Sequence, residues 1–247
     1  VSDLGYVALV YRGETKLELS IDAHLQGLVD FAGVDVPLRY DLASRTIDAF
    51  LPQQVVLGLS FTKVARLHVN VDLTFVNWAA YENPTARTDA SLVVQAPPGI
   101  PLTIPPQPKP TDVLAPNFSN RLVPHVGVEY VLPVAGAPRA VRGEAAPHRA
   151  LEVPLRAGYV YEASPVPPQT GATNFVDADR HTISVGAGAV LNAPASWMPG
   201  SVALDVHGQL SILPDRVTLK QSAADFIGDY RAGGSMLGVG STLTGAF

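Results

Sequence analysis

The sequence contains no cysteine and no long run of apolar residues. Without cysteine in its 247 residues, the chain can form no disulfide, no thiolate metal site and no cysteine nucleophile. No stretch of about 18 consecutive apolar residues occurs either, which argues against a transmembrane helix. Transmembrane β-strands are still possible, because a spanning strand needs only about ten residues, half of them apolar.

The sequence also lacks an excess of basic residues. It has 17 Lys and Arg against 22 Asp and Glu, a formal net charge of -5. With no basic stripe to follow phosphates, we predict that the protein has no nucleic-acid partner. Two glycine-rich stretches, 186–191 and 233–240, lie inside strand patterns and are not followed by lysine. We therefore predict no phosphate cradle, and no cofactor.

Alternation of polar and apolar residues is the strongest pattern present. In RLHVNVDLTF (66–75) the character changes at every step, which is the period of a β-strand. We predict about nine strands, mostly of about 9 to 15 residues and so longer than the ~5–6 typical of globular sheets. They cover 4–12, 16–31, 54–62, 66–75, 122–132, 151–162, 180–191, 201–213 and 236–247.

The predicted connections alternate in length along the chain. Tight or modest turns are expected at 13–15, 63–65 and 192–199, with a medium one at 133–148. Long connections are expected at 33–53, 79–120, 163–179 and 213–233. Long loops at one side of a sheet and short turns at the other are typical of outer-membrane barrels. The proline-dense part of the second long loop, 97–116, is expected to be a stiff surface excursion; a PxxP-type ligand is the alternative.

The pattern alone does not decide which row of side chains faces inward. In a soluble sandwich the apolar row is the core, whereas in an outer-membrane barrel it faces lipid. Aromatic residues near predicted strand ends favour the membrane, where they would form interfacial girdles. These are Tyr11, Phe61, Trp78, Tyr130, Tyr161 and Trp197. We therefore predict an all-β, antiparallel transmembrane β-barrel in the cell outer membrane; a soluble β-sandwich or lipocalin-like carrier of an apolar ligand is the alternative.

Four segments resemble a known family. EYVLP (129–133), LRAGYVYEASPVPPQT (155–170), DADRHTISVGAGAVL (177–191) and the paired-strand region 51–78 are similar to the C-terminal barrel half of FadL-type outer-membrane transporters. The resemblance implies passive transport of long-chain fatty acids or other hydrophobic compounds. It also implies a barrel of fourteen strands plugged by an N-terminal hatch, of which residues 1–247 would be the C-terminal part, without the hatch and early strands. The terminal aromatic Phe247 matches the signal that such proteins present to the barrel-assembly machinery.

In a barrel, the polar rows of these strands would line a lumen. By parity the lining would include Glu18, Asp22, His24, Arg66, His68, Asn70, Asp72, Glu129, Glu152, Arg156, Arg180, Thr182, Asp205 and His207. We expect most of these charges to pair across strands. The candidates for contact with a solute are Arg66, His68, Asp72, Arg156 and Arg180. Arginine in particular offers a bidentate match to a fatty-acid carboxylate.

Catalysis and metal binding have weaker support in the sequence. Ser20, Asp22 and His24 share one face of a predicted strand, but steps of about 7 Å separate them, too far for direct hydrogen bonds. We therefore predict that the protein is not an enzyme. A metal site formed by His24, His68 and His207 has no support either, because nothing in the sequence sets their heights in the sheet.

Overall fold

A computed structural model describes residues 5–31, 33–82, 87–95, 109, 115–141, 148–169, 175–195, 197, 199–223 and 228–246. These residues form eleven β-strands and one 3-10 turn, Trp78–Ala80. The strands are β1 (Gly5–Arg12), β2 (Thr15–Phe31), β3 (Val34–Leu51), β4 (Gln54–Phe61), β5 (Leu67–Val76), β6 (Arg87–Val94), β7 (Arg121–Arg139), β8 (His148–Glu162), β9 (Arg180–Asn192), β10 (Ser201–Thr218) and β11 (Tyr230–Gly245). No helix in the described part of the chain is long and apolar enough to cross a membrane.

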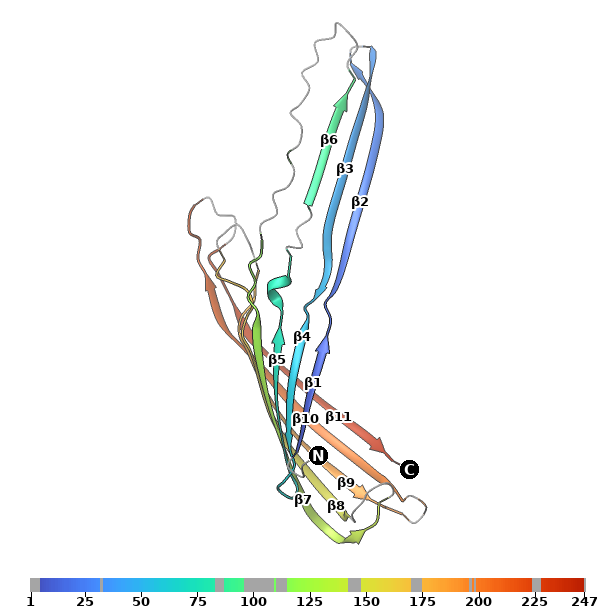
Figure 1. The fold of residues 1–247 in the computed structure, drawn as a ribbon, viewed down its shortest axis with the longest axis vertical. Coiled ribbons are helices and arrows are strands. Elements are labelled where there is room, and N and C mark those ends of the chain that lie inside the picture. The colour runs from blue at the N-terminus through green and yellow to red at the C-terminus, as the bar shows by residue number, and fades with distance from the viewer. Residues whose placement is uncertain are drawn as a thin grey trace. The chain divides into compact units, whose positions relative to one another are not determined.

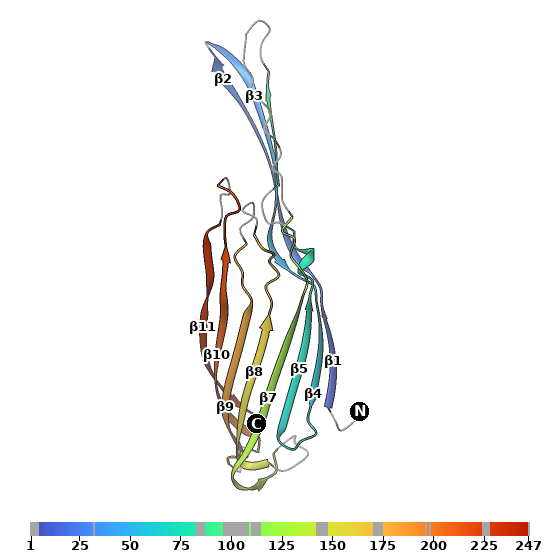
Figure 2. The same cartoon turned by 90° about the vertical axis from the view of Figure 1, so that its left-hand side faces the viewer.

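The chain divides into two compact units. Unit 1 comprises Val1–Arg12, Gln53–Ala79 and Phe118–Phe247. It holds an antiparallel sheet of eight strands in the order β1-β4-β5-β7-β8-β9-β10-β11, drawn side by side in Figure 2. Unit 2 comprises Gly13–Pro52 and Ala80–Asn117 and holds a second antiparallel sheet, β2-β3-β6 (Figure 1).

The all-β, antiparallel prediction is confirmed, and each of the nine predicted strands is present. Two strands were missed, because 34–51 and 87–94 were expected to lie in loops and instead form β3 and β6. The tight turn predicted at 13–15 is wrong. β1 pairs with β4 and β2 pairs with β3, so 13–15 does not join two paired strands. β2 therefore belongs to the second sheet, although its own sequence resembles the other strands.

The eight-stranded sheet of unit 1 has one end with short connections and one end with long ones. Residues 62–66, 140–147 and 193–200 join strands at the first end. At the second, 13–53, 77–120, 163–179 and 219–229 lie between successive strands of the sheet. We call these the short-loop end and the long-loop end. The predicted alternation of connection lengths is thus present in the sheet.

Register places the two rows of each strand on opposite faces of this sheet. One row of consecutive partners crosses all eight strands and is apolar throughout: Val7, Leu59, Val71, Val126, Tyr159, Ile183, Leu210 and Leu237. We call this side the apolar face. Seven of the eight residues are exposed, from 37% for Leu210 to 73% for Val7 and Leu237. The apolar face is therefore not the core of the protein.

Buried apolar residues of unit 1 gather instead at the long-loop end. Val76 and Val123 are 6% and 8% exposed, and Val166 and Ala178, in the connection after β8, are 6% and 8% exposed. Val76 and Val123 alternate with the apolar face, so they belong to the opposite, polar face. The packed part of unit 1 thus lies where long connections meet this face.

The sheet is open in the part of the chain that the structure describes. β1 and β11 each pair with one neighbour only, β4 and β10 respectively. A closed barrel is therefore not formed by the described strands. Phe247, predicted to contact the barrel-assembly machinery, lies outside the described residues, as does most of the proline-rich stretch 97–116.

Candidate functional site

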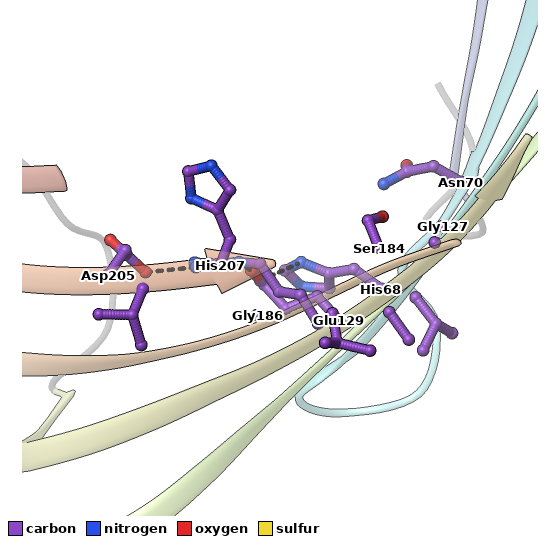
Figure 3. Close-up of a pocket in the computed structure, with 14 residues that line it drawn as sticks. His68, Asn70, Gly127, Glu129, Ser184, Gly186, Asp205 and His207 are labelled. Atoms are coloured by element: carbon purple, nitrogen blue, oxygen red, sulfur yellow. Dashed lines mark hydrogen bonds and ion pairs between the residues drawn. The ribbon is translucent and has the colours of Figure 1, made fainter. Parts of the chain in front are cut away.

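A chain of charged side chains crosses the middle of the polar face of unit 1. Arg156 on β8 donates from Nε to Glu129 Oε2 of β7 at 2.5 Å, and from Nη1 to Asp205 of β10. On the other side of Glu129, His68 Nδ1 of β5 lies 3.4 Å from Oε1. Figure 3 shows His68, Glu129 and Asp205 on this face of the sheet, with dashed lines for the hydrogen bonds and ion pairs. Four strands are thus linked by one polar row, which we call the ion row: His68, Glu129, Arg156 and Asp205.

Glycines make room for this row. Arg156 is followed in register by Gly186, His207 and Gly240. A β-carbon at position 240 would come within 2.6 Å of Cε1 of His207, so the imidazole lies over the bare backbone of β11. Gly127, Gly158 and Gly186 line a pocket of about 570 Å³ above the sheet. The pocket is lined by ion-row residues and by Asn70, Ser184 and His207.

The ion row holds more negative than positive charge. One guanidinium faces two carboxylates, and all three side chains are only partly exposed, at 43%, 26% and 25% for Arg156, Glu129 and Asp205. Arg156 already donates hydrogen bonds to both carboxylates, so an anionic solute would have to displace one of them to bind this guanidinium. The geometry therefore suits cross-strand bracing of a wet surface better than capture of a free carboxylate.

The five predicted site residues do not form one cluster. His68 and Arg156 both belong to the ion row, whereas Asp72 lies two rows nearer the long-loop end, opposite His125 and beside Gly58. Arg180 is farther still along β9, where its Nη2 lies 2.5 Å from Oε2 of Glu162. Arg66 lies in the turn before β5, with a φ of 67°, and is not part of the polar row. The strand begins one residue later than the pattern indicated.

A second polar cluster lies at the long-loop end, and its central residue is Ser164. The Ser164 hydroxyl donates to Asp177 Oδ2 at 2.7 Å, and its backbone N–H donates to Asp179 Oδ1 at 2.8 Å. Its carbonyl oxygen accepts a 2.7 Å bond from Nε of Arg121, at the start of β7. Arg216 of β10 donates to the Ser164 hydroxyl at 3.2 Å. Ser164 is 7% exposed, so it is a buried polar residue whose partners come from three different segments.

Asp179 carries a pKa below its ordinary value in this cluster. The main cause is the hydrogen bond from the Ser164 backbone, and a 3.0 Å bond from the Tyr161 hydroxyl adds to it. The positive charges of Arg121 and Arg216 act in the same direction. A pocket of about 500 Å³ lies beside these groups, lined by Ser119, Arg121, Ser164, Val166, Asp179 and Arg216 among others.

Aromatic rings pack next to this cluster. Phe118 lies edge-on to Phe175, with ring centroids 5.0 Å apart, and 6.3 Å from the ring of Trp78. Trp78, predicted to belong to an interfacial girdle, lies in a 3-10 turn just after β5, and its ring packs in this loop cluster. The two ends of the long connection 77–120 and the connection after β8 therefore meet through these rings.

Sequence reasoning missed the residues of this second cluster. Arg121, Ser164 and Arg216 are separated by 43 and 52 residues in the chain, and no local motif joins them. The proline pairs near them indicated only a loop. The glycines opposite Asp205 and His207 did carry a usable signal, because glycine at alternate strand positions implies that a neighbouring side chain lies over the backbone.

Polar residues predicted for the lumen also occur in unit 2. His24 Nδ1 lies 2.6 Å from Asp41 Oδ1, and Arg45 donates to Glu18 Oε2 at 2.5 Å. His24 therefore contacts a carboxylate across the β2–β3 pair, and the Ser20, Asp22 and His24 spacing builds no triad. Among the described residues of both units, no group of three or more metal-binding side chains is arranged to hold an ion.

Comparisons with family models, curated proteins and solved structures give no match for this chain.

Proposed function

We propose that the eight-stranded sheet of unit 1 forms part of a transmembrane wall in the outer membrane. In this proposal the apolar face contacts lipid and the polar face lines a water-accessible lumen. The protein would pass long-chain fatty acids or similar hydrophobic compounds passively, as the resemblance to FadL-type transporters implies. The observation that carries the proposal is the apolar row that crosses all eight strands and stays exposed, opposite a face with a paired ion row.

The length of β5 and the positions of four aromatic residues fit a bilayer. β5 has ten residues, which is the length that a tilted transmembrane strand requires. Tyr161 and Tyr11 lie near the long-loop end of the apolar face, whereas Tyr130 and Phe61 lie near the short-loop end. Aromatic residues at both ends of an apolar band are typical of barrels at the two membrane interfaces.

The energetic argument favours lipid as the cover of the apolar face. A water-exposed apolar surface extending over eight strands would cost roughly 25 cal/mol for each Å² left in water. Monomeric soluble proteins rarely expose contiguous patches larger than a few hundred Å². Val185, Leu204 and Val239, on the last three strands of the sheet, remain 60%, 51% and 82% exposed. Such a face requires a cover, and hydrocarbon meets that requirement without a second protein layer.

Site-directed spin labelling tests the orientation of the sheet. The chain has no native cysteine, so a nitroxide can be attached to Val71→Cys on the apolar face and to Asn70→Cys, its matched control on the polar face of the same strand. In lipid vesicles we expect oxygen to relax the label at 71 and a water-soluble nickel chelate to relax the label at 70. Equal nickel accessibility at both positions, or a chain that stays in solution without detergent, would contradict the membrane orientation and favour the soluble carrier.

Uptake of a labelled fatty acid tests the transport step. The full-length gene product would be produced in a Gram-negative host that lacks its own fatty-acid uptake protein, and initial uptake of oleate measured. We expect uptake above that of the same host with an empty vector. If the spin labels show that the protein inserts but no uptake of oleate or shorter acids is measured, the transport proposal fails. The proposal that the sheet forms a membrane wall would still stand.

A further inference from the structure

The described residues that follow β8 are tied back to the sheet. Residues 164–169, which we call the strap, are held by hydrogen bonds from arginines on two other strands. Arg216 of β10 donates to the Ser164 hydroxyl at 3.2 Å and to the Val166 carbonyl at 2.9 Å, and Arg121 of β7 donates to the Ser164 carbonyl at 2.7 Å. Arg216 also donates to the Asp177 carbonyl at 3.3 Å, which ties in the return segment of the same connection.

The strap is attached to the polar face. Arg121 lies in the alternation of β7 on the same side as Val123 and His125. Val123 and its diagonal neighbour Val76 are the apolar residues of this face that are buried, and they lie at the strap's end of the strands. Farther along the same face, His68 and His207 stay exposed. Val76 and Val123 are thus buried at the strap's end of the polar face, and Asn192, at the short-loop end of the same face, is buried as well at 4% exposed.

The strap is also fixed internally. Gln169 donates to the Pro167 carbonyl at 2.8 Å and accepts a 3.0 Å bond from the backbone N–H of Phe175. Val166 and Gln169 are each 6% exposed. A segment with buried residues and satisfied polar groups moves as a unit. Its attachment consists of the arginine contacts at Ser164 and Val166 and of one backbone hydrogen bond, in which the Ser119 N–H donates to the Pro165 carbonyl at 3.0 Å.

We infer that the strap is a gate at the long-loop end of the polar face, held closed by Arg121 and Arg216. This inference rests on the proposed transport function, because a gate requires a lumen. The strap borders the pocket of about 500 Å³ at the long-loop end of the polar face, where a solute from that end would pass on its way to the ion row. When the arginine contacts break, the strap leaves Val123 and the polar face open.

Thiol labelling tests the cover without requiring transport. The single-cysteine variant Val123→Cys, folded in detergent, would be treated with a bulky maleimide in the Arg216 and Arg216→Met backgrounds. Loss of hydrogen bonds to a charged group shifts a local opening equilibrium by at least about tenfold, so we expect labelling to accelerate by that factor. Arg231→Met is the matched control, since Arg231 lies at the same end but pairs with Asp215 and not with the strap.

A milder variant covers the case in which Arg216→Met fails to fold. Ser164→Ala removes only the hydroxyl that Arg216 and Asp177 share, and we expect a smaller increase in labelling in the same direction. Equal labelling rates in the native, Ser164→Ala and Arg231→Met backgrounds would overturn the gate.

Flux through the full-length protein in vesicles tests the gating step. We expect the double variant Val166→Cys/Arg216→Cys to pass oleate faster than the native protein, and a short bis-maleimide that bridges the two thiols to reverse this gain. Faster labelling of Val123→Cys with unchanged flux would overturn the gate. If no variant passes oleate, the proposed function fails, and the labelling result separately shows whether the strap covered the polar face.

Discussion

The carboxylate of Asp205 on β10 lies over Gly188 of β9, in the space that a β-carbon at position 188 would occupy. The same carboxylate accepts a hydrogen bond from Arg156, two strands away from its own. Cγ of Pro154 would also lie 3.0 Å from that β-carbon, so the space is limited on both sides. Glycine at 188 is therefore what allows Arg156 to reach across β9.

Replacement of Gly188 by alanine should weaken this link. We expect Gly188→Ala to cost about 1–2 kcal/mol of unfolding free energy, because Asp205 or Pro154 must shift to admit the methyl group. Gly238→Ala is the matched control on the same sheet, since a β-carbon there meets nothing within 4 Å. Denaturant unfolding in detergent measures both. Equal midpoints for the two variants would mean that Asp205 does not depend on the gap at 188.

Arg156→Met should destabilise the sheet by leaving Glu129 and Asp205 without their cation. The group is partly exposed, at 43%, so solvent screening limits the effect to about 1–2 kcal/mol. We expect Glu129→Gln in the same chain to recover part of the loss, because it removes one of the two uncompensated charges. A double-mutant cycle in detergent at low salt provides the measurement.

Arg12→Met serves as the control for Arg156→Met. Arg12 donates to the neutral Gln54 at 3.1 Å and faces no carboxylate partner at that contact. We expect its replacement to change stability by no more than about 0.5 kcal/mol. A loss as large as that of Arg156→Met would show that the ion row has no special role.

Acid should loosen the long-loop end through Asp179. Its pKa is lower in the folded protein than its usual 3.8, chiefly because the Ser164 backbone N–H donates to it. A carboxyl with a lowered folded pKa stabilises the fold fully above the unfolded value, and this contribution is lost as pH falls through the folded value. Native stability should therefore exceed that of Asp179→Asn near pH 6, and the difference should shrink below about pH 4.

Unfolding curves of the native protein and Asp179→Asn at pH 6, 4 and 3 measure this difference. Asp89→Asn is a suitable control, because Asp89 lies in unit 2, where its Oδ2 is 3.8 Å from Nε of Arg87. A constant difference between native protein and Asp179→Asn over this range would contradict the assigned role of the Asp179 charge.

Unit 1 should fold without the β2–β3 pair. Arg12 and Gln54 are direct partners in the β1–β4 register, so a two-residue Asn-Gly turn can replace 13–53 and close a hairpin there. We expect the shortened chain in detergent to keep its β circular dichroism and the slow labelling of Val123→Cys. Rapid labelling would show that unit 1 depends on the β2–β3 pair for its packing.

The strands that the sequence predicted correctly are those whose period is uninterrupted. In β5, and in β10 up to Ile212, polar and apolar residues largely alternate. This alternation is a local property that does not depend on the partner strand. In β3 the residues Pro37, Asp35 and Asp48 resembled a loop. That segment is extended because β2 pairs with it over seventeen residues, and pairing of this kind overrides local propensity.

The candidate site divides in the same way. Parity alone places His68 and Arg156 on the polar side of their strands, because side chains alternate between the two faces. The pairing register between neighbouring strands decides which polar residues meet. A register shift of two residues would bring Arg156 opposite a different side chain while keeping it on the same face. The contacts of Ser164 depend on loops whose course no period describes.

The sequence by itself determined an antiparallel β protein with one apolar row per strand, because side-chain direction in a strand follows from the backbone alone. Only the tertiary structure decided that β2 pairs with β3 in a second sheet, that Arg156 joins Glu129 to Asp205, and that the connection after β8 is tied to Arg121 and Arg216. Register and long-range hydrogen bonds set these outcomes, and both arise between residues far apart in the chain.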